Sequence, residues 1–171
     1  MNLPSEYKVL VITLSDRAYK GEYEDLSGPR VGRRIEEFMK SEGWEYSIDM
    51  KLIPDDQYKL SELVKAASGS CDMIFTTGGT GIGPRDITVE TIRPLLSKEI
   101  PGIMEYIRVK HGTEKPNALL SRGVAGITGK SLIYTLPGSV RAVDEYMTEI
   151  IRTLKHTLLM LYGIDSHGKN Q

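Results

Sequence analysis

The chain has 171 residues, of which 40% are hydrophobic and 26% are charged, and a formal net charge of −1. This composition predicts a folded globular domain rather than a disordered chain, and the balanced charge excludes an overall basic field that would bind nucleic acid or an anionic membrane. The single cysteine, Cys71, excludes an intramolecular disulfide and a cysteine-based zinc site. Because no apolar run has membrane-spanning length and no signal peptide is recognisable, we expect a cytoplasmic protein with neither nucleic acid nor a membrane as partner.

The first half of the chain alternates predicted strands with predicted helices. In chain order, the pattern predicts a strand at 8–14, a polar loop at 15–28, a helix that opens at 27–29 and stops before 43, a strand at 46–52, a helix at 60–67 and a strand at 73–77. The run at 8–14 is apolar and rich in β-branched residues, which is typical of a strand covered on both faces. Residues 46–52 alternate between apolar and polar, which predicts a half-buried strand.

The second half continues with helices and a hairpin. The pattern predicts a helix from Thr88 toward Leu95, a helix from 101 to 110, strand-like runs at 124–127 and 131–136, and a long helix after Ser139. Thr88 and Ser139 are candidate helix caps, and Pro94 should bend or shorten the first of these helices. The residues at 128–130 suit a three-residue hairpin loop. The whole order predicts a three-layer α/β/α sandwich with a mostly parallel, mixed sheet. We expect one domain over 1–164 and a polar tail at 165–171.

A glycine-rich loop follows the third predicted strand. Four of the six residues from 78 to 83 are glycine, which permits positive φ angles and close approach of the backbone to a ligand. Consecutive free N–H groups in such a loop make an anion site, and Thr77 and Thr80 would add hydroxyl donors. The alternative is a tight turn alone, for which two glycines would suffice. The loop therefore predicts a phosphate site beyond the carboxyl ends of the strands, where α/β sheets bind ligands.

Two better-known phosphate motifs do not fit the sequence. The pattern G-x-G-x-x-G fails because Pro84 stands where the third glycine after Gly79 and Gly81 belongs. The segment Gly129-Lys130-Ser131 resembles the end of a P-loop, but Val124 occupies the position of the required first glycine. Neither a dinucleotide fold nor a P-loop is predicted.

Two aspartates stand at neighbouring predicted strand ends. Asp55 follows the second strand, and Asp86 ends the glycine-rich loop. Each has a simpler interpretation as a cap of the helix that follows it. Taken together, two carboxylates beside a phosphate site suit Mg²⁺, which is normally held by one or two carboxylates and by substrate phosphates. The pair predicts a site for a nucleotide and its metal.

Three more segments lie at predicted strand or helix ends. Ser15-Asp16 follows the first strand, and Pro137-Gly138 leads into the last helix, either as a plain helix start or as a second anion-binding turn. Ser121-Arg122 precedes a strand, and Arg122 has two open interpretations: it pairs with a phosphate, or it pairs with a surface carboxylate.

These motifs, taken in order, resemble the molybdopterin adenylyltransferase family, whose domain also occurs in gephyrin. The matching segments are Leu14-Ser15-Asp16-Arg17, Ser27-Gly28-Pro29-Arg30, Ile53-Pro54-Asp55-Asp56, Thr77-Gly78-Gly79-Thr80-Gly81, Pro84-Arg85-Asp86-Ile87-Thr88, Pro101-Gly102, Leu120-Ser121-Arg122 and Leu136-Pro137-Gly138-Ser139. They extend from residue 8 to about 162, which is almost the whole chain. The sequence departs from the family at Ile82-Gly83, where relatives vary, and at Ser139, where many have Asn or Gln.

The resemblance implies a three-layer α/β fold and a homo-oligomer, a trimer or a hexamer, that transfers AMP from Mg·ATP to the terminal phosphate of molybdopterin. Asp55 and Asp86 would be the catalytic and metal-binding residues, with Mg²⁺ as the cofactor. The residues that would bind nucleotide or molybdopterin are Ser15, Asp16, Thr77, Gly78, Gly79, Thr80, Gly81, Ser121, Arg122, Pro137 and Gly138. A protein of the same family that binds molybdopterin without adenylylating it is the alternative.

Overall fold

Six strands form one sheet, in the order β2-β1-β3-β6-β5-β4, in a computed structural model that describes residues 3–164. The strands are β1 (Tyr7–Leu14), β2 (Tyr46–Ile53), β3 (Met73–Thr77), β4 (Lys98–Glu99), β5 (Ala125–Thr128) and β6 (Ser131–Leu136). The first four in the spatial order are parallel, whereas β5 and β4 are antiparallel to their neighbours. The predicted α/β fold with a mostly parallel, mixed sheet is confirmed. The predicted polar tail at 165–171 lies outside the described residues.

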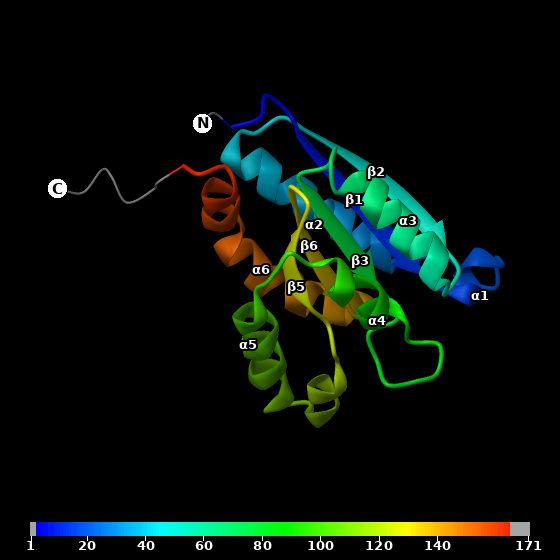
Figure 1. The fold of residues 1–171 in the computed structure, drawn as a ribbon. Helices are drawn as coiled ribbons and strands as arrows, with labels where there is room; N and C mark the ends of the chain where they lie inside the picture. Colours follow the sequence, from blue (N-terminus) through cyan, green and yellow to red (C-terminus); the bar gives the residue numbers. More distant parts are fainter. Residues whose placement is uncertain (1–2, 165–171) are drawn as a thin grey trace.

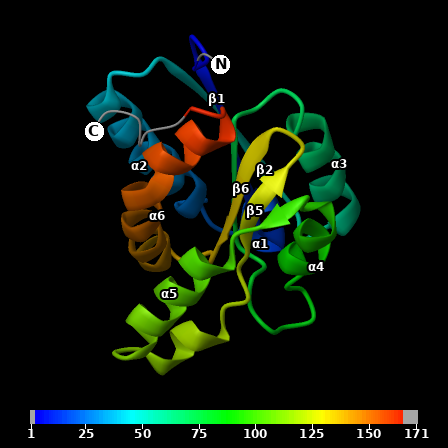
Figure 2. The same ribbon diagram turned by 60° about the vertical axis from the view of Figure 1, so that its left-hand side comes forward.

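Helices cover both faces of this sheet (Figures 1 and 2). On one face lie α2 (Ser27–Glu42), α5 (Pro101–Gly112) and α6 (Val140–Leu161), and on the other lie α3 (Gln57–Ala67) and α4 (Thr88–Ile92). The short helices α1 (Asp16–Tyr19), η1 (Arg93–Leu95) and η2 (Pro116–Leu120) join these elements. None of the helices in residues 3–164 is long and apolar enough to span a membrane.

The central strands β1, β3 and β6 are buried at every position except Lys8, because each face of the sheet has its own core. Along β1, Val9 and Val11 pack toward α2 and α6, whereas Leu10 and Ile12 pack toward α3 and α4. This follows from the two-residue period of a strand, which sends successive side chains to opposite faces. The edge strand β2 differs from its prediction, because Met50 and Leu52 are exposed rather than half-buried.

Three local predictions are corrected by the structure. Thr128 pairs with Ser131, so the hairpin loop has two residues, 129 and 130, and not three. Gly129 supplies the positive φ of 58° that such a tight loop requires. The predicted loop at 15–28 contains the helix α1, and the two-residue strand β4 was not predicted.

The helix after the glycine-rich loop also starts differently from the prediction. Its N-cap position is Ile87, which makes no side-chain capping bond, so Thr88 is not the cap. The Thr88 hydroxyl donates instead to the carbonyl of Gly78, at 2.8 Å, and so ties α4 to the glycine-rich loop. Pro94 shortens the helix as expected, because α4 ends at Ile92 and a 3₁₀ turn follows.

Candidate active site

The carboxyl ends of the parallel strands surround a hollow of ≈ 370 Å³, which we call the acidic hollow. It is lined by Leu14, Ser15, Asp16, Arg17, Tyr23, Asp55, Gly79, Arg85 and Asp86. The strands deliver these residues together because Leu14 pairs with Ile53 and Thr13 pairs with Thr77. Asp55 and Asp86 therefore lie at one hollow, together with a residue of the glycine-rich loop.

Asp16 and Asp55 bind each other's backbone. The N–H of Asp16 donates to Asp55 Oδ2 at 3.2 Å, and the N–H of Asp55 donates to Asp16 Oδ1 at 3.1 Å. Arg85 donates to Asp16 Oδ2 through Nε at 3.0 Å and Nη2 at 2.5 Å, and to the carbonyl of Asp55 at 3.1 Å. The bond from the Asp55 N–H and the contacts with Arg85 lower the pKa of Asp16. Burial raises the pKa of Asp55, and the neighbouring carboxylates of Asp16 and Asp86 add to this.

Neither Asp55 nor Asp86 caps a helix, so the simpler interpretation of each is wrong. The cap of α3 is Asp56, whose carboxylate accepts from the N–H of Lys59 at 3.0 Å. Asp86 Oδ2 accepts from the N–H of Gly83 at 2.7 Å and so folds back onto its own loop. Both carboxylates remain at the acidic hollow with oxygen atoms available for a cation.

The glycine-rich loop needs glycine at two positions in particular. Gly78 and Gly79 have φ angles of 98° and 65°. A Cβ atom on Gly78 would lie 2.3 Å from the carbonyl oxygen of Leu14, and one on Gly79 would lie 2.4 Å from Thr88 Oγ1. Within residues 3–164, the N–H groups from 79 to 82 donate no hydrogen bond. A row of unsatisfied amides beside two carboxylates is an arrangement that accepts an anion and its cation together.

Arg122 fixes the loop although it does not itself line the acidic hollow. Its N–H donates to the carbonyl of Thr80 at 2.9 Å, and its Nε donates to the carbonyl of Gly81 at 2.7 Å. Its Nη2 donates to the carbonyl of Asp86 at 3.2 Å, and both terminal nitrogens bind Glu90. Of the two interpretations left open by the sequence, the structure favours the carboxylate partner, because the guanidinium group is occupied by Glu90 and the loop.

The predicted binding residues divide into two groups. Those that line a hollow are Ser15, Asp16, Asp55, Gly79, Asp86 and Gly138. The others line neither the acidic hollow nor a second hollow next to it that includes Gly138: Thr77, Gly78, Thr80, Gly81, Ser121, Arg122 and Pro137. The Thr77 hydroxyl is buried and donates to the carbonyl of Pro137 at 2.8 Å, so it positions the chain rather than facing a ligand. Ser121 Oγ is buried, and no residue from 3 to 164 forms a hydrogen bond with it.

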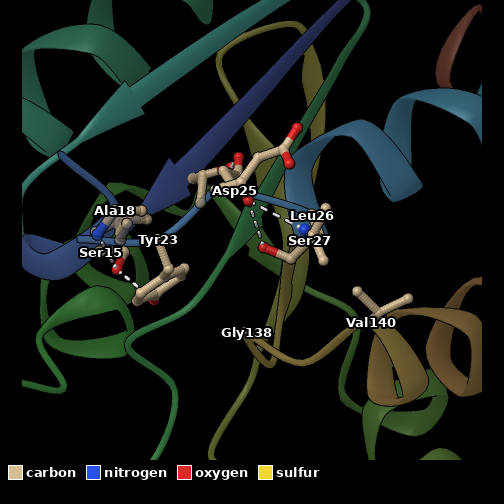
Figure 3. A pocket seen from close by; sticks show the side chains of 11 residues that line it. Ser15, Ala18, Tyr23, Asp25, Leu26, Ser27, Gly138 and Val140 are labelled. Carbon is tan, nitrogen blue, oxygen red and sulfur yellow. Dashed lines mark hydrogen bonds between the residues drawn. The ribbon is translucent and has the colours of Figure 1, made fainter. Parts of the chain in front are cut away.

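Figure 3 shows a second hollow, of ≈ 220 Å³, which we call the neighbouring hollow because it shares lining residues with the first. It is lined by Thr13, Leu14, Ser15, Ala18, Tyr23, Glu24, Asp25, Leu26, Ser27, Gly138 and Val140. Leu14, Ser15 and Tyr23 belong to both hollows. The hydroxyls of Ser15 and Tyr23 lie 2.7 Å apart, so these two side chains form the common wall.

Asp25 organises the neighbouring hollow, although the sequence analysis did not identify it. Its Oδ1 accepts from the N–H and the hydroxyl of Ser27 and from the N–H of Gly28, and its Oδ2 accepts from Thr13 Oγ1 at 2.6 Å. Asp25 thus caps the first turn of α2 and joins it to the end of β1. The N-cap position itself is Leu26, which makes no side-chain capping bond, so the usual capping pattern did not indicate Asp25.

Tyr23 and Glu90 are further residues of the site that the sequence did not indicate, whereas Arg17 and Arg85 appeared there only within family motifs and without an assigned role. Tyr23 and Arg17 lie in a polar segment without periodicity, and the Arg17 guanidinium stacks 5.1 Å above the centre of the Tyr23 ring. Glu90 acts only through Arg122, which lies 32 residues away in the sequence. No local pattern could have indicated that contact.

Fold and site together define an α/β protein that offers an anion-accepting loop and paired carboxylates beyond the carboxyl ends of its parallel strands. Residues 10–156 match the model of the probable molybdopterin binding domain, and the chain belongs to this family. It is 41% identical over 163 residues to a molybdopterin adenylyltransferase of Pyrococcus furiosus, covering 90% of this chain and 92% of that protein. It is 34% identical over 153 residues to a molybdopterin adenylyltransferase of Helicobacter pylori, covering 90% and 86%.

A solved structure has the same fold. The tungsten cofactor synthesizing protein MoaB from Pyrococcus furiosus superposes with a TM-score of 0.80 at 36% sequence identity, covering 93% of this chain and 99% of that chain. The resemblance stated from the sequence motifs is therefore confirmed at the level of the family.

Proposed function

We propose that the protein transfers AMP from Mg·ATP to the terminal phosphate of molybdopterin and releases pyrophosphate. The observation that carries this proposal is that Asp55, Asp86 and Gly79 line one hollow, and that Gly79 opens the stretch of the glycine-rich loop whose N–H groups donate no hydrogen bond within residues 3–164. Curated relatives that cover most of the chain are named molybdopterin adenylyltransferase, which supports the same activity.

The reaction needs alignment of two anions more than it needs a base. An oxygen of the molybdopterin phosphate forms a bond to the α-phosphorus of ATP, and the bond from that phosphorus to the bridging oxygen breaks. Pyrophosphate leaves with the electron pair of the broken bond. A phosphate monoester has a second pKa of about 6, so it is mostly dianionic at pH 7 and no proton has to be removed. This agrees with the acidic hollow, none of whose nine lining residues is a histidine.

The residues present fit a magnesium ion that is bound together with the nucleotide. Asp55 and Asp86 offer carboxylate oxygens, and Mg²⁺ is usually held by one or two carboxylates plus substrate phosphates. Within residues 3–164, no group of three or more His, Cys, Asp or Glu side chains is placed to hold a metal ion unaided. Bound Mg²⁺ would neutralise charge on the phosphate oxygens, and a cation there would also relieve the repulsion between Asp55 and its neighbouring carboxylates.

The two hollows suit two substrates. We assign the phosphates of Mg·ATP to the acidic hollow because its carboxylates match a metal and the undonated N–H group of Gly79 matches an anion. We assign part of the molybdopterin to the neighbouring hollow, which shares Ser15 and Tyr23 with the first. This placement would bring the acceptor phosphate beside the α-phosphorus, and such alignment supplies much of the rate enhancement in phosphoryl transfer. From the family resemblance we also propose a cytoplasmic homo-oligomer, a trimer or a hexamer.

The deciding experiment is a pyrophosphate-release assay with ATP, Mg²⁺ and molybdopterin. The proposal expects stoichiometric pyrophosphate and adenylylated molybdopterin from the native chain, and none of either without molybdopterin. If the chain binds molybdopterin but releases no pyrophosphate, the proposed activity is wrong and the protein is a molybdopterin-binding member of the family.

A further inference from the structure

Two arginines line the acidic hollow, a third binds its glycine-rich loop, and two of the three are engaged by protein partners. Arg122 binds Glu90 and three carbonyl groups of the glycine-rich loop. Arg85 binds the carboxylate of Asp16 and the carbonyl of Asp55. Their positive charges are compensated, and their donors are directed at the protein. Neither can turn to a ligand without breaking the contacts that position the loop.

Arg17 is different in its partners. It lines the acidic hollow, yet among residues 3–164 its side chain forms no ion pair and donates no hydrogen bond. Its guanidinium group lies over the Tyr23 ring, at 5.1 Å from the ring centre, and the Tyr23 hydroxyl is bound to Ser15. Stacking on an aromatic face restrains a guanidinium group while leaving the N–H donors in its plane free. Arg17 is therefore held at the hollow with its donors unused.

The charges at the hollow indicate what those donors would meet. Three carboxylates line it, Asp16, Asp55 and Asp86, and Arg85 compensates only Asp16. Asp55 and Asp86 are the residues that would face the magnesium ion. The β- and γ-phosphates, which leave as pyrophosphate, gain negative charge as the bond to the α-phosphorus breaks, and an arginine is suited to stabilise that charge. Of the two basic residues that line the hollow, only Arg17 is uncompensated.

We infer that Arg17 binds the β- and γ-phosphates of the nucleotide and the pyrophosphate that leaves. This inference rests on the proposed function, which it deepens by assigning a residue to the leaving group. It also predicts different roles for the three arginines: Arg122 and Arg85 stabilise the protein around the hollow, and Arg17 binds the ligand.

The test compares Arg17→Gln with Arg17→Lys and with Lys20→Gln as a matched control. Lys20 follows the same short helix and carries the same charge, but it lines neither hollow. Binding of inorganic pyrophosphate with Mg²⁺ is measured by calorimetry, and KM values for ATP and molybdopterin are measured in the pyrophosphate-release assay. For Arg17→Gln we expect pyrophosphate binding to weaken about tenfold, which is typical for loss of a hydrogen bond to a charged group, with a parallel rise in KM for ATP.

The remaining outcomes separate the possible explanations. Arg17→Lys should recover part of the affinity, and Lys20→Gln should change it less than about twofold, as expected for an exposed charge. A rise in the KM for molybdopterin equal to that for ATP would mean that Arg17 acts only by packing Tyr23, and it would overturn the inference. Unchanged pyrophosphate binding in Arg17→Gln would overturn it as well. If the native chain binds pyrophosphate but releases none from ATP and molybdopterin, the proposed function fails while the binding measurement still decides the role of Arg17.

Discussion

The two walls of the acidic hollow are built in different ways. The glycine-rich loop from 78 to 86 is bound by a partner far away in the sequence, Arg122, which donates to three of its carbonyls, and by the nearby Thr88, which donates to the carbonyl of Gly78. The other wall, from 15 to 26, is fixed by long-range contacts only at its start, where Asp16 binds Asp55 and Arg85. Its remainder has short-range contacts, such as Ser15 with Tyr23, and it exposes Tyr19, Tyr23 and Leu26. Long-range contacts resist local opening more than short-range ones do. The comparison suggests one preformed wall for phosphate and one adaptable wall for the variable parts of the ligands.

The largest expected effect is the loss of AMP transfer when the carboxylate of the glycine-rich loop, Asp86, is removed. We expect Asp86→Asn to lower AMP transfer by at least about 100-fold, since it removes a charge at the reacting phosphates, while the fold is kept because Asn can still accept from Gly83. Asp55→Asn should act in the same direction, mainly through weaker binding of Mg·ATP. Both are measured by the pyrophosphate-release assay and by thermal unfolding.

The matched control for Asp55 is the adjacent residue. Asp56→Asn removes the same charge one position away, and Asn caps a helix as well as Asp does. Activity near the native level in Asp56→Asn is the expected result. Full activity in Asp86→Asn would remove Asp86 from the site and with it the assignment of this wall to the chemistry.

A pair of glycines compares the backbone of the two walls directly. Gly79 and Gly21 have similar φ angles, 65° and 75°, but a Cβ on Gly79 would meet Thr88 Oγ1 whereas one on Gly21 would meet nothing within 4 Å. We expect Gly21→Ala to cost about 1 kcal/mol of unfolding free energy from the φ angle alone. Gly79→Ala should cost about 3 kcal/mol because a steric clash is added. Equal costs in chemical denaturation would contradict the difference in packing.

Two arginine substitutions compare contacts of different kinds. Arg122 binds the glycine-rich loop, whereas Arg85 joins that loop to Asp16 in the other wall. Arg122→Ala should lower the unfolding free energy by about 2 kcal/mol and raise the KM for ATP, because loop carbonyls and Glu90 lose a charged donor. Arg85→Ala should cost less than about 1 kcal/mol, since the Arg85 side chain is 65% exposed against 35% for Arg122. Urea denaturation of the two variants measures both losses of unfolding free energy. A larger loss for Arg85→Ala than for Arg122→Ala would show that the two walls are fixed mainly by the contact of Arg85 with Asp16.

The smallest expected effect is a pH dependence of the free energy of unfolding that comes from Glu90, the carboxylate partner of Arg122. The hydrogen bond from Arg122 lowers the pKa of Glu90 below its ordinary value. A carboxyl whose pKa is lowered by folding stabilises the protein above its unfolded pKa of about 4.3, and this contribution is lost as the pH falls through the folded pKa. The stability difference between the native chain and Glu90→Gln should therefore be present at pH 7 and shrink below about pH 4. Glu105→Gln, an exposed change on α5, controls for the loss of one charge.

The sequence predicted those parts of the molecule that depend on neighbours along the chain. The apolar run of β1, the glycine-rich loop and the placement of Asp55 and Asp86 after strands follow from local pattern and from the geometry of parallel strands. The partner of Arg122 did not follow, because its contacts with Gly81 and Glu90 join residues 41 and 32 positions apart. The helix α1 and the strand β4 were missed because four and two residues are too few to show a period.

Because Ser15 and Tyr23 belong to both hollows, the two substrates would not bind independently if each occupies the hollow proposed for it. A ligand in one hollow that orders Ser15 and Tyr23 would change the free energy of binding in the other hollow, and thermodynamic linkage makes this effect reciprocal. ATP would then alter the affinity for molybdopterin by the same factor by which molybdopterin alters the affinity for ATP. Ser15 and Tyr23 would then couple the binding of one reactant to the binding of the other.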